Sequence, residues 1–198
     1  MKFFVEGSVE DATSLAGELG LCGGVVLPAD APATTPETVS ALVRLVDGPV
    51  FVSVSADDTS ALLAVARNTA RANDYIVVSL PISAPALAIC KTCYEEGIAV
   101  NITGCATAAQ ALLAASANAT YASVPMGPTR PADDRRDDPG SDGAELLQDV
   151  MAIYDGYDLE TLVIAVGLTD PEQVTAAALA GAHAALVTAG LMRAMITL

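Results

Sequence analysis

The chain has 198 residues, 53% of them hydrophobic, and its 24 acidic and nine basic side chains give a formal net charge of −15. This length is enough for one domain with a sizeable core. The acidic balance argues against nucleic acid and anionic membranes as partners, because there is no basic patch to neutralise phosphates. The many carboxylates, few lysines and abundant alanine fit adaptation to high salt or an ordinary acidic cytosolic protein equally well.

Targeting and membrane segments are not expected from the pattern. No apolar run reaches the roughly 18 residues of a membrane-spanning helix. The N-terminal MKFFVEGSVED turns acidic too soon for a signal peptide. No linker or change of composition divides the chain, so we expect a single cytoplasmic domain over residues 1–198.

Short β-branched runs alternate with longer amphipathic segments along the whole chain. The predicted strands are Lys2–Val5, Gly24–Leu27, Val50–Ser55, Ile76–Leu80, Ala99–Thr103, Tyr121–Val124, Leu162–Val166 and Ala184–Val187. The predicted helices lie near residues 9–19, 35–46, 57–72, 84–96, 106–117, 142–155 and 170–181, with a last one from 189 onward. Eight such pairs predict an α/β protein, a single (β/α)₈ TIM barrel, because the count favours a closed barrel over an open sheet.

Capping residues mark several helix boundaries. Thr35-Pro36-Glu37 and Asp170-Pro171-Glu172 each place a cap residue before a proline at the first helical position. Glycines at 20, 48, 97 and 181 stand just ahead of the next strand, as expected at helix ends.

The segment Met126–Gly143 lacks apolar periodicity and is rich in proline, arginine and aspartate. It follows the sixth strand, which places it on the reaction face of a barrel. Two interpretations stay open, a lid or binding loop and a solvated, partly disordered insertion.

Metal and cofactor chemistry find little support in the residues. Cys90 and Cys93 form a CxxC inside a helical pattern without a second ligand pair, which favours packed thiols. Cys105 has no activating base nearby in the sequence, and His183, the single histidine, precedes the eighth strand on the face away from the mouth. No GxGxxG, P-loop or GxSxG motif occurs, so we expect no cofactor and no metal.

Several segments occur together in the same order along nearly the whole chain. They are MKFFVE, ELGLCGGV, LVDGPVFVSV, YIVVSLPIS, EEGIAVNIT, TAAQALLAASANATYAS and ALAGAHAALVT. With these segments the chain resembles the small transaldolase family that includes fructose-6-phosphate aldolase. The resemblance implies a (β/α)₈ barrel, a role in carbohydrate metabolism and a homo-oligomer. Family members usually continue past the point where this chain stops, so the resemblance implies a shortened C-terminus.

The family's reactive positions are changed in this chain. By the resemblance, the Schiff-base lysine corresponds to Ser79, which cannot form an imine because imine formation needs a primary amine. Neither Lys2, at the barrel's edge, nor Lys91, within a helix, can replace it. The first-strand aspartate corresponds to Glu6, and the threonine that helps to hold the catalytic water persists as Thr103.

Other family motif positions have lost their polar groups. The family's TTNP motif is replaced by Val26, Leu27, Pro28 and Ala29. Its phosphate-binding serine and arginine after the seventh strand appear as Gly167 and Thr169, and Arg130 could supply the strand-six arginine only after a two-residue realignment. Because the mouth keeps no arginine at the family's phosphate positions and the net charge repels dianions, we expect any ligand to be neutral or unphosphorylated.

The candidate catalytic residues are Glu6, Ser79 and Thr103, and the candidate substrate-binding residues are Ser53, Asn101, Ser123 and Arg130. Three functions stay open. The first is a divergent transaldolase or fructose-6-phosphate aldolase relative that has lost Schiff-base aldol chemistry. The second is an enzyme acting on a small unphosphorylated carbonyl or sugar compound through Glu6, Thr103 and water. The third is a non-catalytic structural or regulatory partner of an active homologue.

Overall fold

The computed structural model describes residues 1–7, 10, 20–27, 36–46, 48–127 and 141–197. The strands are β1 (Lys2–Glu6), β2 (Val25–Val26), β3 (Val50–Ser53), β4 (Ile76–Pro81), β5 (Val100–Thr103), β6 (Tyr121–Pro125), β7 (Leu162–Val166) and β8 (Ala184–Thr188). The helices are α2 (Pro36–Val46), α3 (Thr59–Ala70), α4 (Ala84–Glu95), α5 (Ala108–Ser116), α6 (Ser141–Gly156), α7 (Pro171–Leu179) and α8 (Ala189–Ala194).

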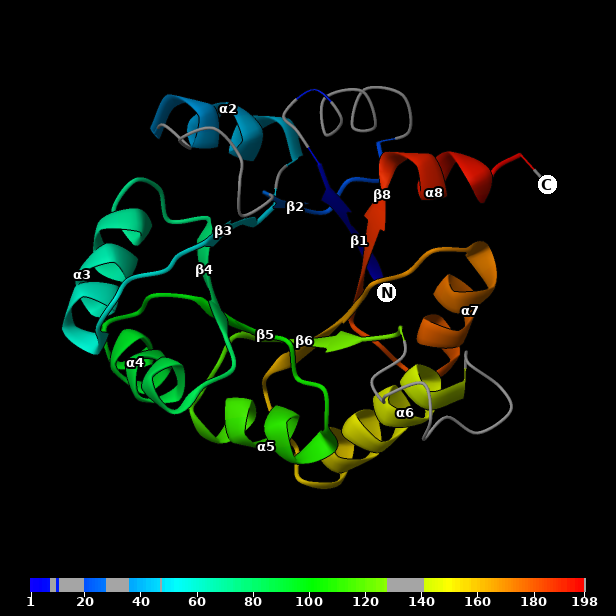
Figure 1. Ribbon diagram of the computed structural model, residues 1–198. Coiled ribbons are helices and arrows are strands. Elements are labelled where there is room, and N and C mark those ends of the chain that lie inside the picture. Colours follow the sequence, from blue (N-terminus) through cyan, green and yellow to red (C-terminus); the bar gives the residue numbers. More distant parts are fainter. Residues whose placement is uncertain (8–9, 11–19, 28–35, 47, 128–140, 198) are drawn as a thin grey trace.

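The strands close into a barrel in the order β1-β2-β3-β4-β5-β6-β7-β8, with parallel pairing throughout and β8 beside β1. Figure 1 shows the strands as an inner ring and the helices as an outer ring. The predicted (β/α)₈ TIM barrel is therefore confirmed. Most of the helix predicted near residues 9–19 and most of Met126–Gly143 lie outside the described residues.

The predicted boundaries differ from the observed ones by a few residues. Strand β2 has only two residues, and β3 ends at Ser53 rather than Ser55. Helices α3, α5 and α7 begin one or two residues later than predicted because Asp58, Thr107 and Asp170 are N-caps with extended backbone.

Glycine has two different roles at the predicted helix ends. Gly97, after α4, has φ +73°, the left-handed conformation expected of a residue that ends a helix. Gly48 was predicted to serve in the same way, but the structure gives another reason for glycine there. A Cβ on Gly48 would collide with the backbone oxygen of Gly23. Two turns approach each other closely here, so there is room only for a residue without a side chain.

Buried side chains form two separate clusters, one on each side of the barrel wall. The larger cluster joins outward-facing strand residues such as Val78 and Ile102 to the helices. The smaller one lies inside the barrel and contains Phe4, Phe51, Val77, Ile164 and Ala184. Because successive side chains of a strand point to opposite faces, this division fixes which residues face the interior.

His183 lies just before β8, at the amino-terminal end of the barrel, as the sequence predicts. Its Nδ1 accepts a hydrogen bond from the Val163 backbone N–H at 3.0 Å, and its carbonyl oxygen accepts one from the Lys2 N–H at 2.8 Å. Partial burial lowers the pKa of the His183 imidazole, against an opposing effect from Asp155. The histidine therefore stabilises the junction of β7, β8 and β1.

We expect His183 to make folding stability depend on pH. Its folded-state pKa is lowered, so the unfolded chain takes up the proton first, and stability is lost as the pH falls below about 6.5. Urea midpoints at pH 8 and pH 5.5 should fall further apart in the wild type than in His183→Asn, whose amide oxygen accepts without titrating. Equal pH dependence in the two proteins would contradict this role.

None of the helices in the described part of the chain is both long and apolar enough to cross a membrane.

Candidate functional site

Three aromatic rings fill the centre of the barrel. The ring centroid of Phe51 lies 5.1 Å from those of Phe4 and Tyr121, and the rings of Phe4 and Tyr121 are 6.1 Å apart. Phe51 is fully buried, and burial raises the pKa of the Tyr121 hydroxyl. We call these three residues the aromatic floor. They close the interior of the barrel beneath the carboxyl ends of the strands.

A polar layer lies directly above the aromatic floor. On five of the strands the next inward position, two residues further along, is polar: Glu6 after Phe4, Ser53 after Phe51, Ser79 after Val77, Asn101 after Ala99 and Ser123 after Tyr121. Side chains two apart on a strand share a face, so this layer borders the carboxyl-terminal mouth. Five of the candidate residues predicted from the sequence thus lie on one inner surface of the barrel.

Ser79, Asn101 and Ser123 form a buried chain of hydrogen bonds across β4, β5 and β6. The Ser123 hydroxyl donates to Asn101 Oδ1 at 3.0 Å, and Asn101 Nδ2 donates to Ser79 Oγ at 3.3 Å. The three residues are 3–4% exposed. This group is called the polar relay, and it gives each of the three side chains at least one hydrogen-bond partner inside the barrel.

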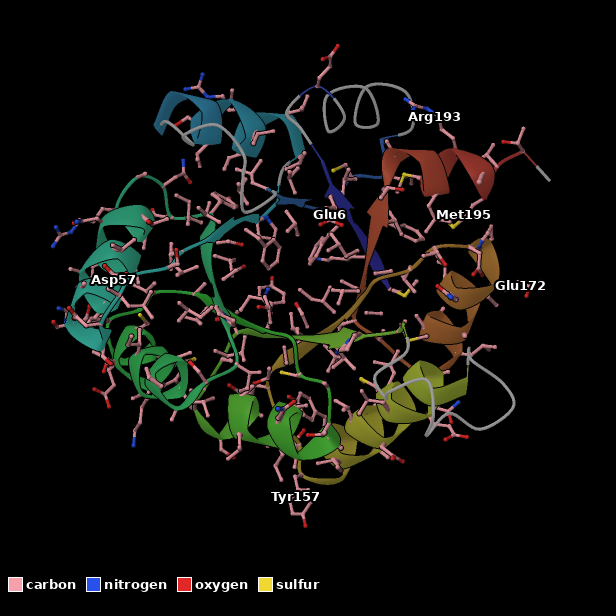
Figure 2. The ribbon with its side chains drawn as sticks, viewed as in Figure 1. Glu6, Asp57, Tyr157, Glu172, Arg193 and Met195 are labelled. Atoms are coloured by element: carbon pink, nitrogen blue, oxygen red, sulfur yellow. The ribbon has the colours of Figure 1, made fainter. Side chains whose placement is uncertain are left out.

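The other candidates are nearer to solvent. Ser53 is exposed and pairs in register with Ser79, whereas Thr103 is half-buried at the end of β5. Glu6 is exposed and pairs with Thr188 of β8. Figure 2 shows Glu6 at the end of β1, within the ring of helices, whereas Tyr157 and Glu172 lie on its outer edge.

The structure thus brings together only part of the predicted site. Among the described residues, no hydrogen bond connects Glu6 or Thr103 to the polar relay. Arg130 lies outside the described residues, so the phosphate-binding role considered for it stays a prediction. The opposite wall of the interior is apolar, since the partly buried Val26, Val166 and Leu186 pack on the inner cluster.

Helix N-termini around the mouth are occupied by the chain's own side chains. Asp58, Ser83, Thr107, Asp170 and Thr188 each accept a hydrogen bond from a backbone N–H in the first turn of α3, α4, α5, α7 and α8, respectively. One of the backbone donors that would attract an anion at each of these ends therefore already has a partner.

Two of these caps are reinforced by a glutamine that the sequence analysis missed. Gln110 Oε1 accepts from the Ala106 N–H, and Gln173 Oε1 accepts from the Thr169 N–H, both at 2.8 Å. In each case the glutamine stands three residues after the cap residue. This is the capping-box spacing, and it could have identified both positions from sequence alone.

The cysteine side chains are buried and lie outside the inner surface of the mouth. Burial raises the pKa of the Cys90 thiol to about 12 and of Cys105 to about 11, and it also raises the pKa values of Cys22 and Cys93. Reactive cysteines need the opposite shift. In the part of the chain that the structure describes, no group of three or more histidine, cysteine or carboxylate side chains could hold a metal ion.

Two hollows are lined by no residue of the polar relay. One, of about 650 Å³, lies at the amino-terminal ends of β4 and β5, where Arg67 forms a bidentate ion pair with Glu96. A smaller one, of about 260 Å³, lies between the turns that precede α3 and α4, with Asp57 and Asp58 among its lining residues. TIM-barrel chemistry takes place at the carboxyl ends of the strands, so the larger hollow is on the face that serves stability.

A closed parallel barrel with polar inner side chains at its carboxyl ends is the architecture of the TIM-barrel enzymes. The chain resembles the thiamine phosphate pyrophosphorylase of Pyrococcus furiosus with a TM-score of 0.63 at 19% identity, over 96% of this chain and 87% of that one. This likeness shows the fold alone.

Sequence relatives narrow the class to one family. The model of the transaldolase/fructose-6-phosphate aldolase family matches residues 32–197. A probable transaldolase of Anaeromyxobacter sp. is 35% identical over 97% of this chain and 88% of its own length. One of Hyphomonas neptunium is 36% identical over 100% and 90%, respectively. The chain belongs to the transaldolase/fructose-6-phosphate aldolase family.

Proposed function

We propose that this chain is a divergent transaldolase-family barrel that binds a small uncharged carbonyl or sugar compound in its mouth without forming an imine. The observation that carries the proposal is Ser79. It stands on the inner face of β4, where the family resemblance assigns the Schiff-base lysine, and it is hydrogen-bonded within the polar relay. A hydroxyl cannot condense with a carbonyl to give a protonated imine.

The two lysines of the chain offer no replacement. Lys2 is exposed at the amino-terminal end of β1, beside the Ala184 end of β8. Lys91 is exposed on α4, in the outer ring of helices. An amine on either residue would have to reach the mouth through the packed barrel wall or around it, so neither supports imine chemistry.

The mouth's electrostatics favour an uncharged ligand. Asp58 and Asp170 place carboxylates at the N-termini of α3 and α7, where a phosphate group would otherwise bind. The wall of Ser53, Ser79, Asn101 and Ser123 offers neutral donors and acceptors, and it faces the apolar side chains of the opposite wall. A compound with oxygen atoms on one side and C–H groups on the other matches these two surfaces.

A second function, proton transfer on such a compound, is favoured by Glu6. It is the carboxylate of the polar layer, it is open to solvent, and it lies on β1, across the mouth from β4 and β5. In this mechanism Glu6 would exchange a proton with bound ligand through water, with Thr103 as a further hydrogen-bonding group.

Borohydride trapping tests the absence of imine chemistry. The intact chain is incubated with dihydroxyacetone and sodium borohydride, and its mass is measured beside an imine-forming transaldolase treated in the same way. We expect the reference enzyme to gain the reduced adduct and this chain to remain unmodified. A stoichiometric adduct on this chain would overturn the proposal.

Calorimetric titration tests the preference for uncharged ligands. We expect dihydroxyacetone to bind at least as tightly as dihydroxyacetone phosphate, because the acid-capped helices and the net charge of −15 oppose a dianion. Tighter binding of the phosphate would contradict this and direct attention to Arg130, Arg135 and Arg136.

A further inference from the structure

The polar relay runs in one direction. Ser123 donates its hydroxyl hydrogen to Asn101 Oδ1, and Asn101 donates an amide hydrogen to Ser79 Oγ. A serine hydroxyl has one hydrogen to donate, and the Ser79 hydrogen is not used in either bond. Among the described residues, no hydrogen bond with Ser79 as side-chain donor is present. The relay therefore ends in an unused donor, the Ser79 O–H, and the second amide hydrogen of Asn101 is also unused among the described residues.

The Ser79 donor lies on the inner face of the barrel, beside a residue that is exposed at the mouth. Ser79 is 4% exposed and faces the barrel interior above Val77, next to the exposed Ser53 on β3. A buried donor that lacks a partner is costly, and hydrogen bonds in series polarise one another. The Ser79 O–H is therefore set to donate to a ligand oxygen at this position.

We propose that Ser79 is a specificity-determining residue that selects ligands presenting a carbonyl oxygen to the end of the polar relay. The inference rests on the proposed binding of an uncharged ligand in the mouth and adds the group that is recognised there. A carbonyl oxygen accepts two hydrogen bonds and brings no hydrogen of its own. An alcohol at the same place brings an additional hydrogen into a buried corner, where a further acceptor has to be found for it.

Dihydroxyacetone and glycerol form a matched pair of probes, since they differ only in the carbonyl group. We measure both dissociation constants by NMR titration of the uniformly ¹⁵N-labelled chain, following the Asn101 side-chain amide. We expect the wild type to bind dihydroxyacetone about fivefold more tightly than glycerol, the ratio that one net hydrogen bond provides.

Three variants test the origin of this ratio. Ser79→Ala should bring the ratio close to one, and Ser79→Thr, which keeps the hydroxyl, should restore most of it. Ser123→Ala removes the first donor of the relay but leaves the Ser79 hydrogen free, so it should keep a clear preference for dihydroxyacetone. The dispersion of backbone amide resonances verifies that each variant is folded.

The outcomes separate this inference from the function on which it rests. If neither probe binds the wild type, the proposed function fails and the inference fails with it. If both probes bind with equal affinity, or if Ser79→Ala keeps the wild-type ratio, only the specificity of Ser79 is overturned. If Ser123→Ala loses the ratio and Ser79→Ala does not, the relay runs in the opposite direction and the assignment to Ser79 is wrong.

Discussion

Ser79→Lys should lower the stability of the barrel by about 3 kcal/mol and yet restore little cleavage of fructose 6-phosphate. The side chain at position 79 is almost fully buried, and its hydrogen-bonding neighbour Asn101 carries no charge. A buried ammonium without an anionic partner has a depressed pKa and destabilises the fold. At this chain length the loss corresponds to roughly 10 °C in the melting temperature.

The matched control for this change is Ser79→Met, which has similar bulk and no charge. The lysine pKa is lowered in the folded state, so the unfolded chain binds more protons and stability of the lysine variant rises with pH toward about 10. The difference in melting temperature between Ser79→Lys and Ser79→Met should therefore become smaller between pH 7 and pH 10. Melting curves at both pH values and an aldolase assay provide the measurements. Turnover close to that of an active family member would show that the rest of the catalytic site is intact.

Phe51→Ala should be the most destabilising single truncation in the interior of the barrel, at about 3–5 kcal/mol. The Phe51 side chain is fully buried and contacts two other rings of the aromatic floor. Its removal leaves a cavity that Phe4 and Tyr121 can fill only in part, because both rings are attached to paired strands. Urea unfolding monitored by circular dichroism measures the loss.

Two controls define that result. Phe51→Leu keeps most of the volume and should cost under 2 kcal/mol. Leu113→Ala on α5 removes a side chain that is 52% exposed and should stay within about 0.5 kcal/mol of the wild type. If Phe51→Ala cost no more than Leu113→Ala, the aromatic floor would not be a stabilising element.

The sequence was sufficient to predict the barrel because each strand is a compact β-branched run and each helix pattern follows it at short range. The strand Ile76–Leu80 is an example, since its apolar residues and the following Pro81 predict both the element and its end within one residue. Helix starts were less accurate. An N-cap such as Thr107 belongs to the same apolar periodicity as the helix that it precedes, and only its backbone conformation separates them.

The polar relay could not be predicted from the sequence. Asn101 lies 22 residues from Ser79 and 22 residues from Ser123, and their contacts depend on the registers of β4, β5 and β6. The sequence identified them only as separate candidates at strand ends. It also gave no means to rank Glu6 and Thr103 below them, because exposure and distance from the relay depend on the closed barrel.

The separation of the two buried clusters has a consequence for how such a protein diverges. The outward-facing cluster ties strands to helices, whereas Glu6, Ser53, Ser79, Asn101 and Ser123 belong to neither cluster. Substitutions at Glu6 and Ser53, the two exposed positions of the five, change what the mouth recognises while the contacts between layers stay in place. A library randomised at Glu6 and Ser53 should retain folded members at high frequency, which makes these two positions the starting point for selecting new binding specificities.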